Sequence, residues 1–219
     1  MNCVIGEDTM IIHKVVRSIL YVFTMIVIMS CGSSTPTRYF IIDLHDVDTV
    51  TSQKSEYNIP EFCAIRQIDS GTMYQEDKII FRDNQNEIKH WNYQRWIAPP
   101  SVLLTSTLKQ GLIDAKVFRG VFDFPSTVTT RYLMDGKILA FEELDNGDNW
   151  SVKVKFEIYL LDNLTRTVVW QKIYENLVSV KKKSIENVVS SFNEATQLCI
   201  GEMIKDLSSG FADVSYTTE

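Results

Sequence analysis

Few side chains in this sequence are spaced for catalysis or for binding a metal ion. Beyond the N-terminal segment the histidines are His45 and His90, and neither has a second ligand at a metal-binding spacing. Glu142 and Glu143 could suggest acid–base chemistry, but adjacent residues on a predicted strand point to opposite faces and cannot share one substrate. There is also no Gly-rich phosphate loop and no GxSxG elbow. The sequence therefore predicts no enzyme, no cofactor and no metal site.

The clearest chemical signal is a cysteine that follows an apolar run. A positive cluster (His13, Lys14, Arg17) precedes 11 residues, 19–29, that are apolar except for Thr24. Such a run is too short to span a bilayer, which takes about 20 residues, but it suits the apolar part of a secretory signal peptide. It ends in Ile28-Met29-Ser30-Cys31, which has the aliphatic residue, small residue and cysteine of a bacterial lipobox. We predict a lipoprotein signal peptide over residues 1–30, starting at Met1 or Met10, and acyl chains such as palmitate on Cys31.

The residues after Cys31 favour a tether over the alternative, a buried core helix. Gly32 to Thr37 is rich in Gly, Ser, Thr and Pro, which is typical of a linker and does not continue a helix. We therefore predict that residues 31–37 are the lipidated cysteine and a short tether. Some bacteria sort lipoproteins by the residue after the cysteine, and Asp there retains them at the inner membrane. Gly32 thus predicts the periplasmic face of the outer membrane.

Composition limits the remaining classes. The chain of 219 residues has 22 Lys+Arg against 28 Asp+Glu and a net charge of −6, which argues against nucleic-acid binding. Four cysteines are too few for a disulfide scaffold of this length. Cys63 and Cys199 could form a disulfide or remain two buried thiols, and the sequence leaves both alternatives open.

Hydrophobic patterning predicts a single domain over residues 38–219. Alternation of apolar and polar residues, clearest from Trp150 to Asp162, indicates half-buried antiparallel strands. Pro99-Pro100 and Ser184 are typical helix N-termini. The predicted strands are residues 38–44, 61–68, 78–82, 87–93, 116–122, 132–144, 150–162 and 167–177, with one helix after Pro99 and one after Ser184. We predict an α+β two-layer sandwich: a mostly antiparallel sheet, its last four strands a meander, with two amphipathic helices packed on it.

Two further motifs allow more than one interpretation. Arg95, Trp96, Pro99 and Pro100 mark a strand-to-helix turn, which is either a packing corner or an interface, because Trp and Arg serve both. The basic run Lys181-Lys182-Lys183 is either a solvated loop or a contact with lipid headgroups, and three charges alone favour the loop.

The lipobox, Tyr39-Phe40-Ile41-Ile42, the block FRDNQNEIKHWNYQRWIAPP, Leu139-Ala140-Phe141-Glu142 and the closing helix together resemble the ABC-type transport auxiliary lipoprotein family. The resemblance covers residues 38–209. It is most specific at Arg95-Trp96 with Pro99, although Ile97-Ala98 stands where the family often has Ala-Glu.

The resemblance implies a non-catalytic accessory subunit of a lipid transport system. Its partners would be an MCE-domain protein that moves lipids between the two membranes, a membrane permease and a separate ABC ATPase. A homo-oligomer is compatible with this role. The alternative is a structural or assembly lipoprotein of an outer-membrane complex, of the kind that plugs a lipopolysaccharide-delivery barrel. An unrecognised periplasmic enzyme ranks last.

Overall fold

The computed structural model describes residues 13–21, 35–43, 57–83, 87–147 and 149–210, and the chain divides into two compact units, Met1–Pro36 and Thr37–Glu219. In the first unit, residues 13–21 form a helix whose apolar side chains, such as Val15 and Leu20, are exposed. None of the helices in the described ranges is long and apolar enough to cross a bilayer. Cys31, Gly32 and His45 lie outside the described residues, so lipidation of Cys31 stays a prediction.

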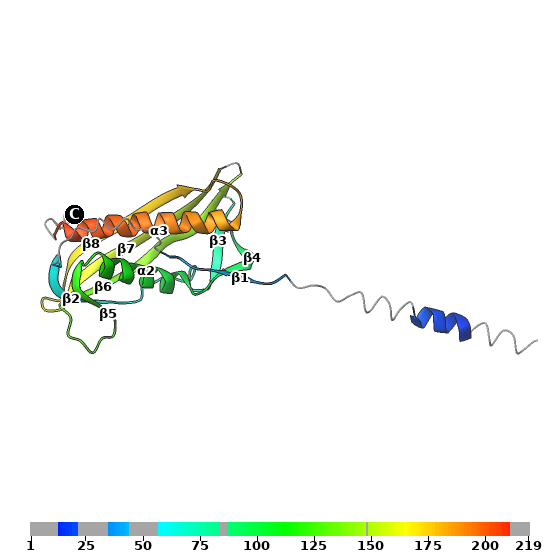
Figure 1. Cartoon of the computed structure of the whole chain (residues 1–219), viewed down its shortest axis with the longest axis horizontal. Coiled ribbons are helices and arrows are strands. Elements are labelled where there is room, and N and C mark those ends of the chain that lie inside the picture. The colour runs from blue at the N-terminus through cyan, green and yellow to red at the C-terminus, as the bar shows by residue number, and fades with distance from the viewer. Residues whose placement is uncertain (1–12, 22–34, 44–56, 84–86, 148, 211–219) are drawn as a thin grey trace, which may run out of the picture. The chain divides into compact units, whose positions relative to one another are not determined.

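The second unit has the predicted order of four strands, a helix, four strands and a helix (Figure 1). The first half comprises β1 (Arg38–Phe40), β2 (Ile59–Ile65), β3 (Lys78–Arg82), β4 (Ile88–Trp96) and α2 (Pro100–Asp114). The second half comprises β5 (Phe118–Asp123), β6 (Tyr132–Asn146), β7 (Asn149–Asp162), β8 (Thr167–Ser179) and α3 (Ile185–Ser208). The order of elements is therefore confirmed, and most limits differ from the prediction by a few residues.

The sheet is mixed, which corrects part of the predicted topology. The long pairings β6–β7 and β7–β8 and the hairpin β3–β4 are antiparallel, but β1–β4, β2–β5, β2–β6 and β3–β6 are parallel. The predicted four-strand meander is wrong at its first member, because β5 pairs with β2 and not with β6. Parallel neighbours need a crossover connection, and α2 lies in the connection that brings the chain to β5. This long-range pairing leaves no local signal in the sequence.

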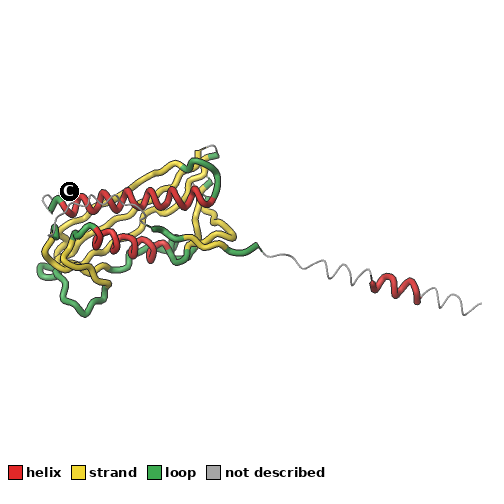
Figure 2. The backbone as a smooth tube through the Cα atoms, viewed as in Figure 1, coloured by secondary structure: helices red, strands yellow, loops and turns green. Residues whose placement is uncertain are grey.

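Two layers form the second unit, as Figure 2 shows, with α2 and α3 on one face of the sheet. Helix α3 packs against β7 and β8, and α2 contacts both α3 and β5. The predicted number of two helices covers this domain but is incomplete for the chain, since the described residues hold a third helix at 13–21.

The core lies between the helices and the sheet. Val152, Val154, Phe156, Ile158 and Leu160 are completely buried, so the predicted alternation of β7 is confirmed. Ser184 caps α3, its side chain accepting a hydrogen bond from the backbone N–H of Asn187 at 3.3 Å. Within the described ranges, every residue of the hydrophobic core lies in the second unit, so we expect residues 37–219 to fold on their own.

Cys63 and Cys199 are both buried free thiols, which decides between the two alternatives left by the sequence. Burial raises the pKa of Cys63 to about 12 and the pKa of Cys199 to about 11. Both sulfurs therefore stay protonated at neutral pH and act as small apolar side chains.

Substitution of alanine at two different glycines should have opposite effects on stability. A Cβ at Gly136 on β6 would lie 2.2 Å from the carbonyl oxygen of Glu157 on β7, so Gly136→Ala should lower the free energy of unfolding by about 1–3 kcal/mol or more. A Cβ at Gly201 on α3 meets no atom within 4 Å, so Gly201→Ala should raise it by about 0.5–1 kcal/mol. Urea unfolding of both variants measures this, and equal effects of the same sign would contradict the packing of β6 against β7.

Candidate functional site

The motif residues form a buried corner between β4 and α2. Trp96 is only 1% exposed, and its ring lies 5.1 Å from that of Phe192 on α3 and 5.7 Å from that of Phe141 on β6. The Trp96–Phe192 pair is perpendicular, which is a favoured aromatic geometry. The indole therefore packs the corner against the central strand β6 and the last helix α3.

Two prolines set the direction of the chain at this corner. Pro99 is extended, with φ −53° and ψ 146°, because a residue before proline is sterically kept out of the helical region. Pro100 occupies the first turn of α2, where its missing N–H is no loss. The carbonyl of Pro99 accepts hydrogen bonds from the N–H groups of Val102 and Leu103 at 2.9 and 3.1 Å, which begins the helix.

The corner also fixes the strand that leads out of the predicted tether. The N–H of Ile97 donates to the carbonyl of Phe40 at 2.7 Å, and β1 lies parallel to β4 with Tyr39 opposite Arg95. Arg95 is itself held by Asp77, at 2.8 Å from Nη1 to Oδ1. The position of β1 therefore depends on the same residues that make the corner.

Exposed apolar side chains surround the buried corner. Ile97 is 58% exposed, Tyr39 57%, Ile41 55% and Tyr93 48%. The parallel register sets Tyr39 on β1 and Tyr93 on β4 on the same face of the sheet, and Ile41 and Ile97 lie just beyond the ends of these two strands. The sequence did not indicate this edge patch (Tyr39, Ile41, Tyr93, Ile97), since apolar residues in or beside a strand ordinarily indicate core.

The carboxylates of Glu142 and Glu143 are buried but do not converge. Glu142 accepts hydrogen bonds from Arg82 Nε at 2.8 Å and Tyr74 Oη at 3.2 Å. Glu143 accepts one from Trp91 Nε1 at 2.9 Å. Burial, with a smaller contribution from the charge of Asp145, raises the pKa of Glu143 to about 7. The two groups serve different contacts, and the described residues contain no cluster of three or more His, Cys, Asp or Glu that could hold a metal ion.

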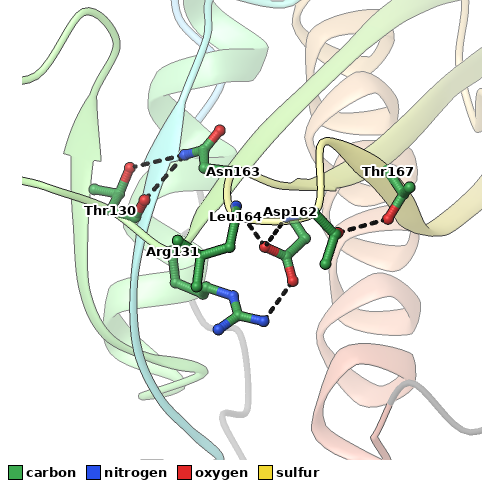
Figure 3. A network of polar contacts seen from close by, with 7 residues as sticks. Thr130, Arg131, Asp162, Asn163, Leu164 and Thr167 are labelled. Carbon is green, nitrogen blue, oxygen red and sulfur yellow. Dashed lines mark hydrogen bonds and ion pairs between the residues drawn. The ribbon is translucent and has the colours of Figure 1, made fainter.

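A separate polar network stiffens the turn between β7 and β8 (Figure 3). Asp162 is almost fully buried and accepts hydrogen bonds from Arg131 Nη2 at 2.6 Å and from the N–H of Leu164 at 2.8 Å. Asn163 Nδ2 donates to the carbonyl of Thr130 at 3.0 Å. The pKa of Asp162 is held below its ordinary value, mainly by the Arg131 hydrogen bond. This turn presents Leu164 to solvent with 74% of its surface exposed.

Residues 45–203 match the family described as the ABC-type transport auxiliary lipoprotein component. The chain belongs to this family. The family predicted from the sequence is thereby confirmed, and the match includes the corner, the network at Asp162 and most of α3. No curated protein sequence matches the chain.

Solved structures share the fold of this family member. Protein XCC0632 from Xanthomonas campestris is 13% identical, with a TM-score of 0.70, and the match covers 80% of this chain and 97% of that protein. An uncharacterised protein is 11% identical, with a TM-score of 0.62, and the match covers 79% of this chain and 99% of that protein. At these identities the likeness concerns the fold alone.

The burial of Trp96 leads to a stability prediction. Trp96→Ala should lower the free energy of unfolding by about 3–5 kcal/mol, because it removes a buried indole and leaves a cavity against Phe141 and Phe192. Its control is Ile97→Ala at the next, exposed position, which should change stability by no more than about 0.5 kcal/mol. Chemical denaturation measures both, and similar losses would refute the packing role of the indole.

Glu143 predicts a pH dependence of stability. Its pKa in the folded chain lies above its ordinary value of 4.5, so between about pH 4.5 and 7 the folded state holds a proton that the unfolded state has lost. The contribution of Glu143 to the free energy of unfolding is therefore greatest below pH 4.5 and declines as the pH rises to about 7. Glu143→Gln should flatten the decline measured by thermal melts from pH 5 to 8, and unchanged slopes would show that Glu143 ionises freely in the fold.

Proposed function

We propose that this lipoprotein is a non-catalytic accessory subunit of an MCE-type ABC lipid transport system, anchored through Cys31 in the periplasmic leaflet of the outer membrane. The observation that carries the proposal is the family match over residues 45–203. The separation of Glu142 from Glu143 and the lack of a three-ligand cluster in the described residues are compatible with it. The ATPase and the permease would be separate chains.

The geometry of the domain supports a receiving role at the membrane that holds it. From Gly32 to Thr37 the predicted tether has six residues, which span at most about 20 Å when fully extended. Strand β7 alone has 14 residues and is about 45 Å long. The anchor is thus shorter than the domain, so the domain stays close to its membrane, and an inner-membrane MCE-domain protein must extend across to reach it.

The two ends of the domain would then have different neighbours. The tether end comprises the start of β1 at Arg38, the hairpin between β6 and β7, and the first turn of α3 (Figure 1). The far end comprises the turn between β7 and β8, where Asp162 fixes the backbone around the exposed Leu164. A rigid turn with an exposed apolar tip is suited to protein contact, because little conformational entropy is lost on binding. We place the MCE-domain contact at this far end.

The anchor itself has a direct test. Cys31→Ala should give an unprocessed chain without acyl groups, because the cysteine supplies the lipidated thiol. Mass spectrometry and flotation of membranes measure this, with Cys63→Ala as the control that should be processed normally. A Cys31→Ala chain with the mature, acylated mass would refute the lipoprotein assignment.

Crosslinking tests the partner and the location together. A photoreactive residue in place of Leu164 should crosslink to the MCE-domain protein, whereas one in place of Lys182 at the tether end should not. Crosslinks from residue 164 to an outer-membrane barrel would favour the assembly-lipoprotein alternative. Recovery of the chain with the inner membrane, or crosslinks to the permease alone, would overturn the proposal.

A further inference from the structure

Contacts across the domain bring the lysine run to the tether end. Arg38, the first residue of β1, lies 2.8 Å from Glu186 in the first turn of α3, measured from Nη1 to Oε1. Residues 181–183, here called the lysine turn, connect β8 to α3 and immediately precede this helix turn. Figure 1 shows the start of β1, the β6–β7 hairpin and the first turn of α3 at the same end of the domain.

The third lysine of the run holds the turn in place. Lys183 Nζ donates to the carbonyl of Gly147 in the β6–β7 hairpin and lies 3.7 Å from Asp145 Oδ1. It also lies 4.6 Å above the ring of Trp150, in cation–π geometry. The Lys183 ammonium group therefore contacts the chain itself and fixes the turn against the β6–β7 hairpin.

The side chains of the other two lysines are open to solvent. Lys181 and Lys182 are exposed, and neither forms an ion pair within the part of the chain that the structure describes. Two acidic groups beside the lysine turn are already paired, Asp145 with Lys183 and Glu186 with Arg38. The tether end thus presents local positive charge on a chain whose net charge is −6.

The edge patch adds apolar surface close to the same tether. Tyr39 and Ile41 follow Thr37 by two and four residues. Tyr93 lies on the neighbouring strand β4, and Ile97, just after β4, donates its N–H to the carbonyl of Phe40. Tyrosine suits a membrane interface, because its ring is apolar while its hydroxyl reaches water or headgroups.

We propose that the tether end is a membrane-binding surface, on which Lys181 and Lys182 bind anionic lipid headgroups and the edge patch lies at headgroup level. The proposal rests on the anchoring proposed above, since a six-residue tether keeps this end within about 20 Å of the bilayer. Contact of this surface with the lipid sets the orientation of the domain and directs the turn at Leu164 away from the membrane. The protein then stands upright on its membrane instead of rotating freely about its tether.

Vesicle binding by a chain that begins at Gly32 tests this surface without the lipid anchor. It should sediment with phosphatidylglycerol vesicles, weakly or not at all with phosphatidylcholine vesicles, and less as salt is added. Lys181→Gln with Lys182→Gln should weaken binding about 25-fold, because each lysine at an anionic surface contributes about fivefold. Tyr39→Ser should weaken it several-fold. Because the chain in this assay carries no acyl group, vesicle binding can fail even if Cys31 is lipidated in the cell. Vesicle binding can likewise succeed even if Cys31 is not lipidated.

A charge-matched control separates a local surface from general attraction. Arg166→Asn with Lys205→Gln removes two exposed positive charges at the far end, from the β7–β8 turn and the last turn of α3. Asn is chosen because Arg166 has φ +59°, which Asn tolerates. This control should change binding by less than about twofold. Equal losses from the control and the lysine variant would overturn the proposal, and so would phosphatidylglycerol binding unchanged in the lysine variant. Unchanged binding by Tyr39→Ser would refute the part played by the edge patch.

Discussion

Three aromatic rings join the segments on which the rest of the domain depends. Trp96 closes β4 before α2, Phe141 lies on the central strand β6, and Phe192 lies on α3, with ring centres between 4.7 and 5.7 Å apart. Aromatic pairs of this kind contribute about 0.5–1.5 kcal/mol each beyond their burial. Because β1 pairs with the last residues of β4, the same cluster fixes the point at which the chain enters the domain.

Buried carboxylates constrain the two faces of β6 in different ways. Asp135 and Glu142 are paired with Arg66 and Arg82, so their charge is compensated where solvent is excluded. Among the described residues the side-chain donor to Glu143 is the indole N–H of Trp91, and burial raises the pKa of Glu143 to about 7. A protonated, neutral Glu143 avoids most of the free-energy cost of burying a charge. This cost is therefore absent at low pH and appears as the pH rises through the pKa of Glu143.

The domain is asymmetric along its length, and the asymmetry fits an accessory lipoprotein that is held by one membrane. At the tether end, Lys183 fixes a turn that leaves Lys181 and Lys182 exposed. At the far end, Asp162 fixes a turn that exposes Leu164. The turn at Leu164 is held by part-buried hydrogen bonds, and the lysine turn is held by the contacts of Lys183 with the β6–β7 hairpin, so each presents a defined surface. A charged surface suits lipid headgroups, whereas an apolar tip suits a protein partner.

Local signals in the sequence determined the elements and the family. The alternation of β7, the cap at Ser184 and the prolines before α2 each act within a few residues, so they can be recognised without knowing the fold. The same holds for the corner motif, whose residue types identified the family but not whether Trp96 faces a partner or the core.

Only the tertiary structure decided which segments of the chain lie side by side. The parallel pairing of β2 with β5 and β6, and the contact of Arg38 with Glu186, join segments far apart in the chain, and their energies depend on neighbours that no sequence window contains. Burial of Glu143 and exposure of Tyr39 and Ile97 follow from that arrangement. The sequence by itself determined which segments are strands and helices and which family they belong to, because those signals are short-range. The mixed sheet, the buried corner and the two distinct ends were decided by packing, because side-chain burial is a property of the assembled layers.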